Sequence, residues 1–237
     1  MKNQNEFING IKDGIPICLG YFSVSIAYGM MAVLSGLPLW AAVLISCTNL
    51  TSAGQFAGTN LILAGGGYIE MIMTMIVINI RYFLMSLSMS QKADPAMTSK
   101  ERLAVSYGIT DEIFAVAMKH PGTLTACYMA GLILGPVLGW TGGTFVGGAV
   151  TRLLPQEISN ALGIALYGMF IAVVVPEAKK SRAVMFTMVL AVALSTVIYY
   201  MPGLSALSGG WGIIVVTVIS CTAAALLFPV EEEREEL

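Results

Sequence analysis

Residues 183–201 read AVMFTMVLAVALSTVIYYM, which is a run of 19 residues without a charged side chain. A helix needs about 20 apolar residues to cross the hydrocarbon core of a bilayer. Further uncharged runs cover residues 14–69 and 121–151, and the quoted run continues uncharged to residue 230. A soluble domain has to cover its surface with polar groups, and stretches of this length cannot supply them. The pattern therefore predicts an integral membrane protein and argues against a soluble enzyme.

The composition of the whole chain agrees with this prediction. Of its 237 residues, 57% are hydrophobic and 11% are charged, whereas about a quarter are charged in soluble domains. Strands of a transmembrane barrel alternate apolar and polar residues over about ten positions, but these runs are apolar on every side. We therefore predict an all-α, polytopic helical membrane protein of about seven or eight spans. Some segments are expected to be broken or re-entrant, and residues 1–237 should form one transmembrane domain.

Charge and cysteine content argue against several other classes. The formal net charge of −2 offers no basic surface, so we expect no nucleic-acid partner. The four cysteines lie inside apolar runs and none forms a CxxC pair, so we expect neither a disulfide framework nor a metal site. The single histidine, His120, lies at a segment boundary, and no nucleophile motif stands out. We therefore expect no catalytic residue, no metal and no cofactor.

The apolar segments are separated by polar or glycine-rich boundaries. They cover residues 15–35, 38–63, 68–90, 105–118, 121–139, 140–153, 157–176, 183–201 and 211–228. Pro16 suits the first turn of the first helix. The positive-inside rule places the Lys/Arg-rich loops 91–104 and 177–182 in the cytoplasm. The last two spans then return the acidic tail, residues 231–237, to the same side.

The side of the membrane on which the chain begins stays open. Three complete crossings before the loop 91–104 would place the N-terminus outside, whereas Lys2 and Lys12 favour the cytoplasm. Segment 38–63 could instead re-enter without crossing, because its centre is polar. Non-helical backbone at membrane depth occurs only where protein or a water-filled cavity surrounds it.

A weak internal duplication would relate residues 1–90 to residues 121–201. In each part an apolar stretch ends at a Leu-Pro pair, at 37–38 and at 154–155. An apolar segment with small polar residues, a break and a Met- and Val-rich span follow in both. Transporters are often built from such repeats, with their sites at broken helices near the membrane midplane.

Arg81 is the charged residue that is hardest to place. It lies well inside segment 68–90, where a cation costs roughly 2.5–3.5 kcal/mol on insertion scales. It needs an anionic partner or water, and Asp111 and Glu112, the only acids of the next segment, are the natural candidates. We predict a coupling or gating role for Arg81, Asp111 and Glu112, with Arg81 as part of a gate, as part of a proton relay or as a cation that binds a carboxylate. The alternative is an interfacial arginine at the end of its helix.

The stretch Thr48–Gln55 is the best candidate for a substrate site. A break in a helix exposes N–H groups that attract a carboxylate and carbonyls that attract an ammonium, and neutral polar side chains add donors and acceptors. The alternative is hydrogen bonding and close packing between helices, for which Gly54 and Gly58 form a GxxxG pair. The predicted substrate-binding residues are Thr48, Asn49, Thr51, Ser52, Gln55 and, from the next segment, Asn79.

Five glycines recur at every fourth position of one stretch and form a glycine ridge. They are Gly131, Gly135, Gly139, Gly143 and Gly147. Such a ridge permits close approach of two backbones, with a bend at Pro136. Packing is the expected role, and the packing partner could be another subunit. His120 is expected at the membrane interface, and the alternative is a proton-linked role.

Short motifs follow one another in a fixed order along the chain. They are Gly10-Ile11-Lys12-Asp13-Gly14-Ile15-Pro16 with Leu19-Gly20-Tyr21, Ala53-Gly54-Gln55-Phe56, Asn79-Ile80-Arg81-Tyr82, Thr110-Asp111-Glu112, Trp140 with Gly143-Thr144 and Gly147-Gly148, and the span from Asn160 to Pro176. In order and spacing they resemble the AzlC-type branched-chain amino acid permeases over nearly the whole chain. One departure lies near Ala165, where many members carry an aspartate.

The resemblance implies the large subunit of a two-component exporter of leucine, isoleucine and valine in the cytoplasmic membrane. It also implies a small AzlD-type membrane subunit as partner, an amino acid as substrate, and secondary transport driven by the proton gradient. Composition and periodicity by themselves indicate only a polytopic protein with polar groups at depth. The alternatives are a channel, a transporter of another small zwitterion, and an assembly or scaffold subunit of a membrane complex.

Overall fold

The computed structural model describes residues 2–151, 171, 174–176, 178–201 and 210–228 of the chain. The named elements in this part are all helices, which confirms the all-α class. Five of them are long and apolar enough to cross a membrane: α1 (Lys2–Leu34), α4 (Tyr68–Lys92), α7 (Ala126–Thr151), α9 (Arg182–Tyr200) and α10 (Gly210–Leu227). Four are short: α2 (Leu39–Thr48), α3 (Ser52–Leu63), α5 (Ser99–Ser106) and α6 (Asp111–Lys119).

The chain forms two compact units. The first contains residues 1–59 and 78–163, and the second contains residues 60–77 and 164–237. The boundary passes through α3 and α4, so each of these helices contributes residues to both units. All the residues predicted for the site belong to the first unit.

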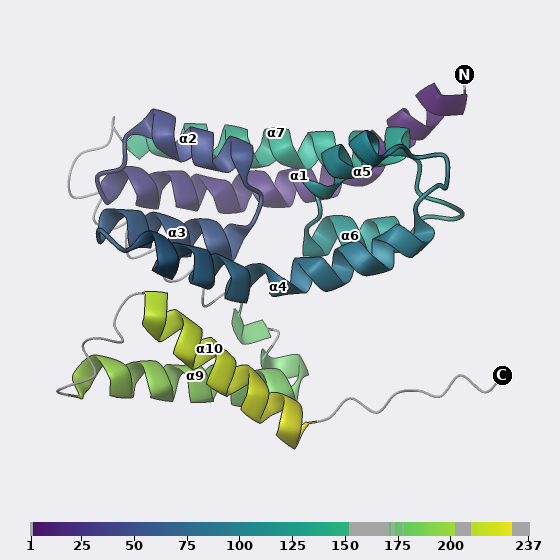
Figure 1. Cartoon of the computed structure of the whole chain (residues 1–237). Helices are drawn as coiled ribbons and strands as arrows, with labels where there is room; N and C mark the ends of the chain where they lie inside the picture. Colours follow the sequence, from purple (N-terminus) through teal and green to yellow (C-terminus); the bar gives the residue numbers. More distant parts are fainter. Residues whose placement is uncertain (1, 152–170, 172–173, 177, 202–209, 229–237) are drawn as a thin grey trace. The chain divides into compact units, whose positions relative to one another are not determined.

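The glycine ridge of α7 packs against α1, and the two helices form the centre of the first unit (Figure 1). A Cβ atom added at Gly131 would lie 2.2 Å from the carbonyl oxygen of Phe7, and one at Gly147 would lie 2.1 Å from that of Ile26. Packing is therefore confirmed as the role of the ridge. Its partner is α1 of the same chain and not another subunit, because α1 brings Gly29 of its own into the contact.

The predicted start of the first helix, at residue 15, is wrong. α1 begins at Lys2, so Pro16 lies inside the helix and not in its first turn. The polar N-terminal turns are helical because they continue the contact with α7. A Cβ atom at Gly10 would lie 2.1 Å from the carbonyl oxygen of Tyr128, and the Tyr128 hydroxyl donates to Asp13 at 2.8 Å.

A second predicted boundary, between segments 121–139 and 140–153, is also wrong. α7 is a single helix that contains Pro136. Its buried small residues continue along α1 on both sides of the proline, from Gly131 to Gly148. Tertiary packing therefore outweighs the loss of one backbone hydrogen bond at the proline.

α2, the link 49–51 and α3 form the first hairpin, so segment 38–63 is broken as predicted. Asn49, which follows α2, is extended, with φ −153° and ψ 123°. Its side-chain Oδ1 accepts a hydrogen bond from the backbone N–H of Thr51 at 2.8 Å. Such a turn reverses the chain, because the side chain takes the place of a backbone acceptor.

α5, residues 107–110 and α6 form the second hairpin, which the sequence did not predict. α5 begins at Ser99, inside the expected loop 91–104, because Thr98 and Glu101 form a capping box. The helix expected over residues 105–118 is interrupted, and α6 begins only at Asp111. At the other end of α6, the Lys92 ammonium donates to its last carbonyl groups, including that of Met118 at 2.7 Å.

Figure 1 shows the two hairpins entering the first unit from opposite ends, with their turns in the middle. α2 and α3 have 10 and 12 residues, which gives lengths of only about 15 and 18 Å against a hydrocarbon core of about 30 Å. α1 and α7 run parallel, since Phe7 lies beside Gly131 and Ile26 beside Gly147. The N-terminus is therefore on the same side as the start of α7, as expected if residues 38–63 re-enter without crossing.

The second unit contains α9 and α10, which pack against each other. The Glu70 side chain accepts hydrogen bonds from the backbone N–H groups of Gly210, at 2.6 Å, and Trp211, at 3.2 Å. A carboxylate at a helix N-terminus satisfies free N–H groups and interacts favourably with the helix dipole. Glu70 therefore fixes the start of α10.

Several sequence predictions fall outside the described residues. They include the span 157–176 for most of its length, the position of Ala165 and the acidic tail 231–237. The proposed repeat of residues 1–90 in residues 121–201 also includes such residues. It stays a prediction.

Candidate functional site

The turns of the two hairpins meet inside the first unit. The hydroxyl group of Tyr107, which follows α5, donates a hydrogen bond to the backbone carbonyl of Cys47 near the end of α2. These two residues lie 60 positions apart in the sequence. The contact therefore closes one turn onto the other.

A cavity of about 280 Å³ lies between the two turns and the middle of α4. Its lining residues are Thr48, Asn49, Leu50, Thr51, Asn79, Tyr82, Ser86, Ser106, Tyr107 and Ile109. Ligand pockets in proteins begin at roughly 300 Å³, so the cavity is just below that range and suits only a ligand of few atoms. Among these residues, hydroxyl and amide groups stand beside the apolar side chains of Leu50 and Ile109, and none carries a formal charge.

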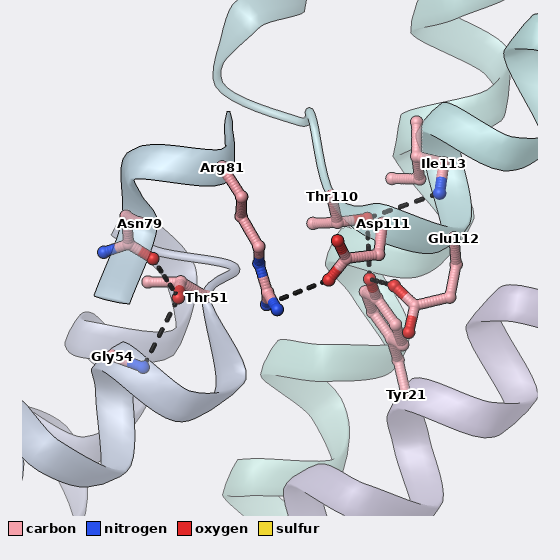
Figure 2. Close-up of polar contacts among 9 residues, drawn as sticks. All are labelled: Tyr21, Thr51, Gly54, Asn79, Arg81, Thr110, Asp111, Glu112 and Ile113. Carbon is pink, nitrogen blue, oxygen red and sulfur yellow. Dashed lines mark hydrogen bonds and ion pairs between the residues drawn. The ribbon is translucent and has the colours of Figure 1, made fainter. Parts of the chain in front are cut away.

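Four of the six predicted substrate residues line this cavity: Thr48, Asn49, Thr51 and Asn79. The Thr51 hydroxyl donates to Asn79 Oδ1 at 2.6 Å, which ties the first hairpin to α4 (Figure 2). The same hydroxyl accepts weakly from the backbone N–H of Gly54, at 3.4 Å. The amide nitrogens of Asn49 and Asn79 have no hydrogen-bond partner among the described residues.

The other two predicted residues, Ser52 and Gln55, are not part of the cavity wall. Gln55 is 1% exposed. Its amide nitrogen donates to Ser46, and its oxygen accepts from the indole N–H of Trp140 at 2.8 Å. Both ends of the side chain are thus engaged, and Gln55 joins both arms of the first hairpin to α7.

Arg81 forms an ion pair with Asp111. Its Nη2 atom lies 2.9 Å from Asp111 Oδ2, and the side chains are 52% and 48% exposed. The guanidinium also lies 5.3 Å from the centre of the Tyr82 ring. Figure 2 shows it between Thr51 of the first hairpin and Asp111 of the second. Of the two acids predicted as partners, Asp111 is the one that pairs.

Glu112 has a different partner. The Tyr21 hydroxyl on α1 donates to Glu112 Oε2 at 2.6 Å, and it lies 2.7 Å from Thr110 Oγ1 (Figure 2). The Tyr21 ring also packs edge-on against Trp140, with 5.4 Å between the ring centres. The two adjacent acids therefore connect the second hairpin to different helices.

The Asp111 carboxyl group is the titratable member of the pair, because the guanidinium of Arg81 is not deprotonated in a protein.

Residues of the second turn and of α4 complete the cavity, and the sequence did not single them out for it. Ser106, Tyr107 and Ile109 belong to the segment 105–118, which the sequence predicts as uninterrupted. Tyr82 enters only through the motif Asn79-Ile80-Arg81-Tyr82. A local signal could not find them, because the second hairpin itself was missed.

His120 lies outside the cavity. Its ring stacks on that of Tyr128, with 3.8 Å between the ring centres. Its Nε2 atom lies 3.9 Å from Glu6 Oε2. The four cysteines are unpaired.

Known proteins match this chain over much of its length. A sequence profile of the family described as "AzlC protein" matches residues 16–154. "Inner membrane protein YgaZ" of Escherichia coli K12 is 25% identical over 210 residues, which cover 86% of this chain and 86% of that protein. An "uncharacterized membrane protein" of Archaeoglobus fulgidus is 27% identical over 175 residues, covering 73% of this chain and 76% of that protein. No solved structure matches the chain.

The family match includes both hairpins and every residue of the cavity wall. It spans more than half of the 237 residues. The relatives are named as membrane proteins, in agreement with the five membrane-length helices among the described residues. Family and relatives together support a transporter-type role in a membrane. The chain belongs to the AzlC protein family.

Proposed function

We propose that this protein is the large subunit of a secondary transporter that exports leucine, isoleucine and valine across the cytoplasmic membrane, coupled to the proton gradient. The observation that carries the proposal is the cavity between the two hairpin turns. A membrane protein that holds broken helices around a small cavity has the parts that alternating access requires.

The chemistry of the wall suits an aliphatic amino acid. The amide groups of Asn49 and Asn79 and the hydroxyl groups of Ser86 and Ser106 can bind a polar headgroup. Leu50 and Ile109, with the rings of Tyr82 and Tyr107, offer apolar surface for a branched side chain. A neutral wall favours a ligand without net charge, and a zwitterion meets this condition.

The helix ends at the turns add backbone groups to the wall. α2 and α5 end there, and α3 and α6 begin there. The carbonyl ends of helices attract cations and the amide ends attract anions. A zwitterionic headgroup carries both charges, so it is the kind of ligand that such a pair of turns would favour.

Coupling would involve the charged set beside the cavity, Arg81, Asp111 and Glu112. Arg81 is next to Tyr82 of the wall, and Asp111 follows Ile109 of the wall by two residues. Glu112 accepts from the Tyr21 hydroxyl, which also contacts the Thr110 cap. We also propose a small AzlD-type membrane subunit as partner. The family membership supports this partner, and no contact surface is assigned to it.

Transport by purified protein tests the proposal. The full chain, co-purified with its small partner, is reconstituted in proteoliposomes, and efflux of labelled leucine is followed with and without a pH gradient. We expect saturable transport of leucine, isoleucine and valine that a protonophore abolishes. Absence of transport over a panel of amino acids would refute the proposal, and conductance without saturation would indicate a channel.

Two asparagine variants test whether the cavity is the substrate site. Asn79→Leu removes the amide from the cavity wall and should lower transport on the order of tenfold, since two polar contacts of about 0.5–1.5 kcal/mol each are lost. Asn60→Leu is the matched control, because Asn60 is exposed on α3 outside the wall. Equal transport by both variants would move the site elsewhere.

A further inference from the structure

The Arg81–Asp111 pair stands at the edge of the cavity. Tyr82, the neighbour of Arg81 in α4, lines the wall, and so does Ile109, two residues before Asp111. Figure 2 shows the guanidinium reaching between the two hairpin turns. Both side chains are about half exposed, so neither is sealed off by protein.

We propose that the substrate headgroup inserts into this ion pair, with its carboxylate on Arg81 and its ammonium on Asp111, and that a proton competes with the ammonium for Asp111. This inference rests on the proposed function and names the headgroup site and the coupling residue within it. An α-amino acid carries one positive and one negative charge. Arg81 therefore exchanges the Asp111 carboxylate for the substrate carboxylate, and Asp111 exchanges the guanidinium for the substrate ammonium.

The position of Arg81 makes this exchange reasonable. A cation at membrane depth needs an anionic partner or water, and Asp111 supplies the partner when the cavity is empty. The closest contact joins one guanidinium nitrogen to one carboxylate oxygen. A guanidinium has five N–H donors and a carboxylate has two oxygens, so both groups can bind further atoms while the pair opens.

The surroundings of Asp111 single it out from Glu112. Among the described residues, the charged or titratable groups near it are Arg81 and Tyr82 on α4, Glu112 on its own helix, and Tyr21 on α1. Tyr21 engages the Glu112 carboxylate and the Thr110 cap. Glu112 is therefore committed to holding the hairpin, while Asp111 holds only the side chain that would bind the substrate.

Competition gives the direction of coupling. An exporter driven by inward proton flow must carry substrate outward and protons inward on alternate half-cycles. A carboxylate that binds either the substrate ammonium or a proton, but not both, imposes this alternation.

The test is ligand binding to the full chain with its partner, measured from pH 5.5 to 8. In the wild type, leucine affinity should fall as pH decreases, approaching about tenfold per pH unit below the Asp111 pKa, as expected for one competing proton. 4-Methylpentanoate, which lacks the ammonium, should bind more weakly and should not lose affinity as pH falls. Equal pH dependence of the two ligands would overturn the inference.

Protein variants and ligand analogues together form a double-mutant cycle, in which one change removes a protein group and the other removes a ligand group. Removing the ammonium should weaken binding more than tenfold in the wild type and less than twofold in Asp111→Asn. Leucinol, which lacks the carboxylate, should bind much more weakly than leucine to the wild type but equally to Arg81→Gln. Glu101→Gln is the control, because this exposed carboxylate on α5 lies outside the cavity wall, and it should keep the one-proton dependence of leucine binding.

The outcomes separate the two proposals. If the wild type binds no branched-chain amino acid, the proposed function and this inference both fail. If it binds leucine but Asp111→Asn retains the proton competition, or Glu101→Gln loses it, only the inference fails. If a variant does not fold, the wild-type comparison of leucine with 4-methylpentanoate still decides the role of the ammonium.

Discussion

The two hairpins are held in place by different kinds of contact. In the first hairpin, Ser46, Gln55 and their partners Trp140 and Thr144 are all neutral and at most 1% exposed. The Ser46 and Thr144 hydroxyl groups are 2.7 Å apart. In the second hairpin, Asp111 and Glu112 are charged and exposed to a larger degree, and they reach Arg81 and Tyr21.

This difference distinguishes a hairpin that is fixed by neutral contacts from a hairpin whose contacts depend on charge. Neutral buried groups keep their hydrogen bonds at any physiological pH, and breaking them is costly because the partners stay without water. Half-exposed ion pairs contribute only about 0–1 kcal/mol and change with protonation. We therefore expect the first hairpin to stay in place while the second one moves.

The largest effect is expected from the helix pair that supports both hairpins. A Cβ atom at Gly143 would lie 2.1 Å from Ser25 Oγ and 2.3 Å from the carbonyl oxygen of Phe22. Gly143→Leu should abolish folding of the first unit, because backbone of α1 cannot give way. Gly142→Leu is the control, since Phe22, at 4.0 Å, is the nearest contact there. Size-exclusion profiles in detergent compare them, and two equal profiles would contradict the packing.

The next effect concerns the first hairpin alone. Gln55→Leu leaves the Trp140 indole N–H without its acceptor in a buried place, which should cost roughly 1–3 kcal/mol of unfolding free energy. Hydrogen exchange should increase in residues 46–59 and not in residues 107–113. Ser23→Ala is a suitable control, because this exposed hydroxyl bonds only to its own helix at Leu19. Unchanged exchange in the variant would mean that Gln55 does not hold the hairpin.

The second hairpin should respond to a smaller change. Tyr21→Phe removes the hydroxyl that holds Glu112 and Thr110 but keeps the ring against Trp140. We expect a loss of about 1 kcal/mol, since such a contact is partly solvated. Hydrogen exchange should now increase around residues 110–113 and stay constant in residues 46–59. The opposite pattern would mean that the second hairpin is the fixed one and the first hairpin the movable one.

The smallest effect is expected at the outer end of the second hairpin. Hydrogen bonds from the Thr98 backbone and side chain lower the pKa of the exposed Glu101 carboxyl. Because the folded pKa is lowered, this stabilisation is complete above the ordinary value of about 4.3. It is lost as the pH falls through the lower folded pKa. Thr98→Ala should lower the melting temperature at pH 7 slightly, and this difference should become smaller at acidic pH, where the hydroxyl no longer has the Glu101 carboxylate as its acceptor. The part that remains comes from the hydroxyl that accepts from the Glu101 N–H. A difference that is constant with pH would exclude the bond to the carboxylate as a contributor.

The sequence by itself determined the membrane class, the break near Thr48–Gln55 and the need of Arg81 for an anionic partner. These follow from local physics: the length of uncharged runs, the polarity of a few adjacent residues and the cost of a charge at membrane depth. Long-range contacts were not accessible in this way. The glycine ridge indicated close packing but could not name α1 as the partner.

Only the tertiary structure decided which polar residues face the cavity and which hold the scaffold. Gln55 and Asn79 are both amides in apolar surroundings, yet one is enclosed by Ser46 and Trp140 while the other lines the wall. Asp111 and Glu112 are adjacent, yet they bind different helices. The reason is geometric, since these contacts join residues as far as 91 positions apart. Neighbours along a chain share their composition, but the packing of distant helices assigns their partners.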